Sequence, residues 1–218
     1  MKSLFLIPLV LFTLSSCGQR RVRGTGVNVT ITRDVPAFTA IEAAGSADVE
    51  VFPAATSRVE ITGYKNLLPH YKSTVSGGIL SLGFESDDDI RIKNSNIRVR
   101  VYGPGIERID VAGSGNATIH PGATALLRTA SVAGSGDITI RQSDAPSLAL
   151  AIAGSGSINA REARAANVEA EIAGSGDIEV TATEQLKVDI AGSGDVHYWG
   201  SPRVEKDVAG SGDVVQGN

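Results

Sequence analysis

The sequence predicts an all-β protein folded as a parallel β-helix, a single-stranded β-solenoid with coils of 18 to 21 residues. The main observation is the tetrapeptide Ala-Gly-Ser-Gly, whose first glycine recurs at Gly113, Gly134, Gly154, Gly174, Gly192 and Gly210. Intervals of 21, 20, 20, 18 and 18 residues are typical of a solenoid, in which each repeat packs only on its neighbours. The composition agrees, because 25 of 218 residues are glycine and aromatic residues make up 5%, which favours short strands and tight turns.

The N-terminal segment has the pattern of an export signal. Lys2 is followed by an apolar stretch from Leu4 to Leu14, which is too short to span a bilayer as a helix. The sequence Leu14-Ser15-Ser16-Cys17 resembles a bacterial lipobox, so we expect a lipoprotein signal peptide at 1–16 and lipidation of Cys17, the only cysteine. An ordinary secretory signal with an unmodified cysteine is the alternative. Residues 17–26 are then the lipidated cysteine and a polar tether.

Residues 27–106 read as less regular coils of the β-helix domain that we assign to 27–218. Ala44-Gly45-Ser46-Ala47-Asp48 matches the later corners, with Ala47 in place of the second glycine, and 75–82 is another strand, turn, strand unit. The segment 98–102 alternates as a strand does. A separate N-terminal sandwich remains an alternative.

Residues 107–218 are the regular coils. Apolar residues stand two before each first glycine (Val111, Val132, Ile152, Ile172, Ile190 and Val208) and four after it (Ala117, Ile138, Ile158, Ile178, Val196 and Val214). Alternation at period two predicts a strand with one buried face on each side of the corner. Each coil then closes through a polar turn, such as 141–144 or 181–184. An antiparallel meander is the rival arrangement, but identical residues at the same phase favour parallel stacking.

The repeats continue almost to the C-terminus, so the last strand edge has to be shielded. We expect either that residues 214–216 fold across it or that a partner chain covers it, which would make the protein a homo-oligomer through the C-terminal edge. Trp199 follows an inward position, at Tyr198. It is expected to close this end of the solenoid, and a stacking platform for a glycan is the alternative.

These motifs together resemble the head GIN domain family of putative auto-transporter adhesins. The resemblance rests on the lipobox, on Phe38-Thr39-Ala40-Ile41 followed by the Gly45 corner, and on the serial corners that end in Asp-Val or Asp-Ile. It implies a right-handed β-helix of the pectate-lyase type, without a recognised catalytic set, and a role in adhesion. The Gly-Ile-Asn tripeptide that names the family is absent from this chain.

An acidic column is the strongest candidate for a metal site. The residue after the second corner glycine is Asn116, Asp137, Ser157, Asp177, Asp195 or Asp213, with Asp48 as the upstream equivalent. Carboxylates stacked at about 4.8 Å repel one another, and Ca²⁺ bound by Asp137, Asp177, Asp195 and Asp213 would relieve this repulsion. The alternative is that these side chains accept hydrogen bonds from nearby backbone N–H groups. We therefore expect no obligatory cofactor.

Catalytic readings have little support. His70, His120 and His197 show no metal-ligand spacing, and no Gly-x-Ser-x-Gly elbow is present. A carbohydrate-active enzyme could use the charged residues near Asp87, Asp88 and Asp89, but a solvated loop is the favoured interpretation, and contact of this loop with a ligand is a further alternative. A net charge of −4 gives no reason to expect nucleic-acid binding.

The sequence thus predicts a non-catalytic envelope lipoprotein, attached to the outer membrane through Cys17, that presents a repetitive surface to a glycan or protein ligand. It could face the cell surface or the periplasm. Gly18-Gln19-Arg20-Arg21 slightly favours a periplasm-facing structural or binding lipoprotein, because an acidic export run is missing.

Overall fold

The protein is described here by a computed structural model that covers residues 20–85, 90–124 and 127–218. Within these residues the chain forms β-strands and one 3₁₀ helix, and a single large sheet contains all the strands except β1 (Arg20–Arg23) and β8 (Ile90–Lys93), which pair with each other. None of the helices in the described ranges has the length and apolar character needed to cross a bilayer. The predicted signal peptide and Cys17 lie outside the described residues.

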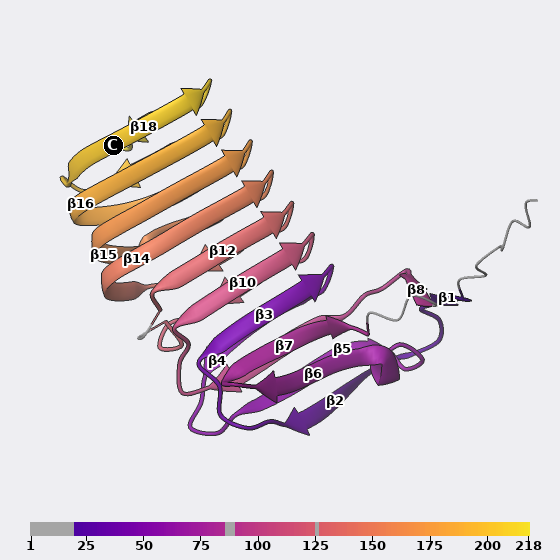
Figure 1. The fold of residues 1–218 in the computed structure, drawn as a ribbon. Helices are drawn as coiled ribbons and strands as arrows, with labels where there is room; N and C mark the ends of the chain where they lie inside the picture. Colours follow the sequence, from indigo (N-terminus) through magenta and orange to yellow (C-terminus); the bar gives the residue numbers. More distant parts are fainter. Residues whose placement is uncertain (1–19, 86–89, 125–126) are drawn as a thin grey trace, which may run out of the picture.

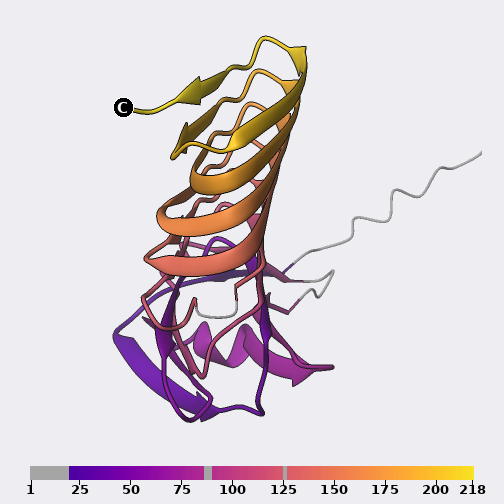
Figure 2. The same ribbon diagram turned by 90° about the vertical axis from the view of Figure 1, so that its left-hand side faces the viewer.

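The second half of the chain is a parallel β-solenoid, as predicted (Figure 1). Equivalent residues of successive coils lie in register, so that Gly113 pairs with Gly134, Gly134 with Gly154 and Gly154 with Gly174. Figure 2 shows the coils one above another, with the C-terminus at the top. The strands are β10 (Arg108–Gly113), β11 (Ala117–Ile119), β12 (Thr129–Gly134), β13 (Ile138–Ile140), β14 (Ser143–Gly154), β15 (Ile158–Gly174), β16 (Ile178–Gly192), β17 (Val196–Trp199), β18 (Arg203–Gly210) and β19 (Val214–Gln216).

Both glycines of each corner are required by stacking. The first adopts a positive φ, for example +133° at Gly134, and its carbonyl accepts two N–H groups of the next coil. At one level Ser135 and Gly136 donate to the Gly113 carbonyl at 2.8 and 3.1 Å. A Cβ on Gly136 would overlap the carbonyl oxygen of Gly115, so this glycine is needed for close approach rather than for its backbone conformation.

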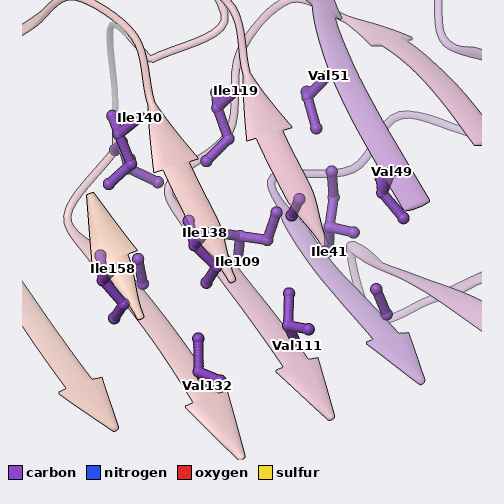
Figure 3. Packing of buried hydrophobic residues seen from close by; sticks show 14 of the residues in the cluster. Ile41, Val49, Val51, Ile109, Val111, Ile119, Val132, Ile138, Ile140 and Ile158 are labelled. Atoms are coloured by element: carbon purple, nitrogen blue, oxygen red, sulfur yellow. The ribbon is translucent and has the colours of Figure 1, made fainter. Parts of the chain in front are cut away.

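Aliphatic side chains fill the interior in columns, one residue of each column from each coil. Val111 and Val132 lie next to each other at the end of their strands, and Ile138 and Ile158 do the same after the corner (Figure 3). These residues are at most 3% exposed. The stack of Val and Ile chains is continuous with the core under the N-terminal strands, and burial of this apolar surface is the main stabilising term.

The predicted polar turns are only partly correct. A break does occur at Arg141 and Gln142, where Gln142 has a φ of 39°. Residues 181–184, however, belong to β16, which continues without interruption from Ile178 to Gly192. Ala182 is fully buried in this part of the strand, and the pairing with the preceding coil changes register on both sides of it, between Ala160 and Arg164 and between Ala165 and Asn167.

The N-terminal strands mix parallel and antiparallel pairing, unlike the solenoid coils. They are β2 (Asn28–Asp34), β3 (Ala40–Gly45), β4 (Asp48–Pro53), β5 (Arg58–Tyr64), β6 (Tyr71–Ser76), β7 (Ile79–Phe84) and β9 (Arg98–Gly103), and helix η1 (Leu68–His70) precedes β6. The unit at 75–82 is an antiparallel β6–β7 hairpin, and β5 pairs antiparallel with both β2 and β9. The division of the domain near residue 107 stays a prediction.

The Gly45 corner is the first level of the stack. β3 and β4 pair in parallel with β10 and β11, so Gly45 lies beneath Gly113. A Cβ on Gly115 would overlap the carbonyl oxygen of Ala47, whereas Ala47 itself has no preceding corner beneath it. This explains why alanine is accepted at position 47 and glycine is required at the same place in the following coils.

The C-terminal edge is not covered by residues 214–216, contrary to one expectation from the sequence. β19 pairs in parallel with β17 and so continues the stack, while β18 pairs with β16. Within the described ranges, β16 is the one strand that pairs with β18 and β17 is the one strand that pairs with β19, so the other edge of both is open.

Candidate functional site

The outer face of the long sheet carries a groove parallel to the solenoid axis. The residue just before each corner glycine is alanine, and all six of these alanines are exposed: Ala112, Ala133, Ala153, Ala173, Ala191 and Ala209. Because each side chain ends at Cβ, the surface is hollowed between the corner and the neighbouring column of larger side chains. The resulting cavity of about 530 Å³, which we call the alanine groove, runs past β12, β14, β15, β16 and β18.

One rim of the alanine groove is acidic. Glu171, Asp189 and Asp207 occupy the same position in three successive coils and are the charged residues among those that line the groove. Ser131 and Ala151 continue this rim toward the N-terminus. The groove therefore offers an apolar floor and a negative edge to a ligand. The alanine column is visible in the sequence, and its regular recurrence was the signal that sequence reasoning missed.

A second, more polar groove of about 440 Å³ lies beside it on the same sheet and includes Arg128, Asn167 and Gln185. Between the two grooves Lys187 donates to Glu169 at 2.8 Å and contacts Asp189 at 3.1 Å. The hydrogen bond to Glu169, followed by the one to Asp189, raises the pKa of Lys187. All these side chains are well exposed, so the ion pairs contribute little to stability.

Glu169, Glu171 and Asp189 could together offer three ligand atoms to a metal ion, because these atoms lie within 4.8 Å of one another. Lys187 already pairs with two of them. Its positive charge opposes the binding of a cation at the same place.

The predicted acidic column forms a ladder of hydrogen bonds along the solenoid. The aspartates and Asn116 accept the backbone N–H of the equivalent residue in the next coil, at 2.9 Å from Ser157 to Asp137 and at 2.8 Å from Asp213 to Asp195. Asp177 accepts the N–H of Asp195 in the same way at 3.0 Å. The donors belong to the neighbouring coil, so these carboxylates join coils rather than close their own turns. Ca²⁺ binding by this column stays the alternative hypothesis.

Trp199 is half-buried near the C-terminal end. The guanidinium of Arg161 lies over its ring at 4.1 Å, and Gly217 packs so closely on the indole that any larger residue there would overlap it. The indole Nε1–H is buried without a hydrogen-bond partner among the described residues. The indole thus has close neighbours within the chain, which favours a structural role over a sugar platform. Asp87, Asp88 and Asp89 lie outside the described residues.

The histidines lie on separate elements. His70 ends η1, His197 is in β17, and His120 follows β11. His120 belongs to a stack of rings on the outer surface that was not predicted from the sequence. The ring centroids of His120 and Phe52 are 4.2 Å apart, and those of Phe52 and Tyr102 are 5.5 Å apart. The Arg58 guanidinium carbon lies 3.8 Å from the centroid of the Tyr102 ring. Outward positions on adjacent strands bring these residues together, and the strand pairing needed to see this was not evident from the sequence.

Similarity to solved structures confirms the fold. A putative adhesin from Bacteroides fragilis is 21% identical with a TM-score of 0.69, covering 89% of this chain and 99% of that one. A putative adhesin from Parabacteroides merdae is 21% identical with a TM-score of 0.60 over 91% and 99% of the two chains. A putative lipid binding protein from Parabacteroides distasonis is 23% identical with a TM-score of 0.55 over 91% and 100%.

None of the curated proteins with which the chain was compared matches it. The family model described as "Putative auto-transporter adhesin, head GIN domain" matches residues 37–202. This range begins just before Phe38, whose segment carried part of the resemblance, and includes all but the last of the repeated corners. The chain therefore belongs to the head GIN domain family of putative auto-transporter adhesins.

Proposed function

We propose that the protein is a non-catalytic, lipid-anchored adhesin that uses the outer face of its long sheet to bind a glycan or protein on another surface. The observation that carries this proposal is the alanine groove, an open cavity of about 530 Å³ that extends over several coils. A ligand that lies along the axis would contact the same small side chains at each level. Membership of a family of putative adhesins supports the assignment.

The same surface argues against catalysis. Its charged groups recur once per coil, as Glu171, Asp189 and Asp207 do, whereas an active site needs different groups that converge on one reacting atom. A carbohydrate-active enzyme is thus the least supported alternative. The lipid anchor at Cys17 rests on the lipobox, and a single acyl chain binds membranes only marginally, so stable attachment requires more than one chain.

A periplasm-facing binding lipoprotein is the main alternative, and Gly18-Gln19-Arg20-Arg21 after the lipobox cysteine favours it. Protease treatment and antibody labelling of intact and lysed cells distinguish the two locations. An adhesin on the cell surface is cleaved and labelled in intact cells. Protection until the cells are lysed would contradict surface display.

Substitutions in the alanine column test the binding face. Ala173→Gln fills the alanine groove, whereas Ala112→Gln places the same side chain in the same column outside the groove lining. We expect cells or beads that carry the Ala173→Gln chain to lose attachment to glycan-coated or matrix-coated surfaces. The Ala112→Gln control should attach like the natural chain, and equal attachment by both variants would contradict a role for the groove.

A further inference from the structure

A small polar pocket lies on the outer surface of the N-terminal strands, apart from the alanine groove. It measures about 240 Å³ and is lined by Asn28, Ser46, Asp48, Thr62, Ser95, Asn96, Ile97 and Arg98. This volume is below the roughly 300–1,000 Å³ of sites for drug-sized ligands. The pocket therefore fits one small group rather than an extended molecule.

Strand pairing explains how the polar groups meet. Asp48 in β4 is paired with Arg98 in β9, and Arg98 is paired with Thr62 in β5, so the three side chains form a row on one face of the sheet. This row extends the acidic column of the solenoid, because Asn116 lies directly above Asp48 and donates to it. The pocket is thus built where the regular stack meets the antiparallel strands.

Several polar groups of the pocket are held in place by the protein. Asp48 Oδ1 accepts both the backbone N–H and the side-chain amide of Asn116, at 3.3 and 3.1 Å. Asn96 accepts the N–H of Tyr64 at 3.2 Å and donates to Asn28 at 2.8 Å. A site that is ordered before binding loses less conformational entropy when a ligand arrives.

Other polar groups of the same pocket still have hydrogen-bonding capacity. The Ser95 hydroxyl is buried without a partner among the described residues, and such a group calls for an explanation. Within the same ranges, no hydrogen bond or ion pair is formed by the Arg98 guanidinium or by the second carboxylate oxygen of Asp48. The Asn28 side-chain amide adds a further donor.

The charges indicate which ligand suits the pocket. Arg98 opposes a cation and Asp48 opposes an anion, so the pair is balanced for a neutral molecule. The other lining side chains, apart from the buried Ile97, are uncharged hydroxyls and amides that can both donate and accept hydrogen bonds. A sugar ring has this character, with hydroxyls that both donate and accept and with apolar C–H faces. We propose that the pocket binds one neutral sugar residue of a glycan, with Asp48 and Arg98 as its main contacts.

This proposal goes beyond the proposed function, because the pocket shares no lining residue with the alanine groove. It is tested on the purified full chain by saturation-transfer NMR and calorimetry with a panel of neutral methyl glycosides. Glucuronate, glucosamine and sugar phosphates serve as charged probes, and glycerol serves as a small polyol. Groove variants and cell attachment are not involved, so either idea can fail without the other.

We expect at least one neutral glycoside to bind, and its affinity to fall about tenfold or more in Arg98→Met and in Asp48→Asn. Asp48→Asn keeps an oxygen that can accept from Asn116, so the link to the next coil is preserved. Arg100→Met is the matched control, because Arg100 lies two residues along the same strand and outside the pocket lining. The proposal is overturned if no neutral glycoside binds, if only charged probes or glycerol bind, or if Arg100→Met weakens binding as much as Arg98→Met.

Discussion

The two glycines of a corner are required for different reasons, and three alanine substitutions separate these reasons. Gly45→Ala tests backbone conformation alone, because φ is +99° and a Cβ there meets nothing within 4 Å. Gly136→Ala tests packing alone, since its φ lies outside the left-handed region and its Cβ would overlap the Gly115 carbonyl. Gly134→Ala combines both, with a φ of +133° and an overlap with Gly113.

The expected free-energy costs follow from these geometries. An alanine that is held at a positive φ, as in Gly45→Ala, costs about 1–3 kcal/mol of backbone strain. Separating two coils at Gly136 weakens two hydrogen bonds to the Gly113 carbonyl, at 2.8 and 3.1 Å, each worth about 0.5–1.5 kcal/mol. Because packing between the two coils is lost together with these hydrogen bonds, we expect Gly136→Ala to lower the free energy of unfolding by about 2–4 kcal/mol. Gly134→Ala should lower it most.

Thermal and denaturant unfolding of the three variants and the natural chain provide the measurement. For a domain of this size each kcal/mol lowers Tm by about 2–4 °C, so Gly136→Ala should lose about 5–15 °C. The reasoning is refuted if Gly136→Ala unfolds like the natural chain. It is also refuted if Gly45→Ala, whose Cβ meets no atom within 4 Å, is as damaging as Gly134→Ala.

Four further predictions concern the columns of the solenoid. Asp195→Ala should lower the free energy of unfolding by about 1–2 kcal/mol, because the Asp213 N–H loses its acceptor. Asp195→Asn keeps an acceptor oxygen and should be nearly neutral. Equal effects of the two variants in urea unfolding would contradict the hydrogen-bond ladder of the acidic column. Ca²⁺ added to metal-stripped protein should produce neither calorimetric heat nor a change in Tm, and a saturable heat would instead support a metal site in the acidic column. Lys187→Met should destabilise slightly at low salt and not at high salt, as followed by Tm. Because the pKa of Lys187 is raised, its contribution should be constant from neutral pH to about pH 10 and should be lost on the alkaline side only above that range. The double variant Lys206→Val, Gln216→Val should associate end to end more strongly, as measured by analytical ultracentrifugation. Both side chains occupy columns that are mainly apolar in the preceding coils, so the two polar residues keep the C-terminal edge from pairing with another chain. An unchanged sedimentation coefficient would contradict this role of Lys206 and Gln216.

The sequence was sufficient for the solenoid because its signal repeats. Val111, Val132 and Ile152 recur at one phase, and a period of about 20 residues with identical corners leaves parallel stacking as the simplest arrangement. The hairpin of β6 and β7 could not be recognised in this way. Alternation around Gly77 and Gly78 looks the same for a hairpin as for a coil, and the direction of pairing depends on contacts with β3 that are distant in sequence.

The candidate sites were harder to predict than the fold. The acidic column was found from the repeat, but its hydrogen-bond donors come from the next coil, and a single coil gives no sign of that. The polar pocket joins residues that are up to 70 positions apart, from Asn28 to Arg98. Its existence depends on which N-terminal strands are neighbours, which periodicity does not reveal.

The corner that repeats at every level also makes the coil a unit of length. Removing residues 155–174 would join Gly154 to Ser175 and place Ile178 on Ile138, in the position that Ile158 occupies now. The molecule would become shorter by about 4.8 Å, the spacing of one strand, while the corner and core columns stayed in register. A gene that gains or loses whole coils can therefore adjust how far the protein reaches from its base without changing the corner that joins one coil to the next.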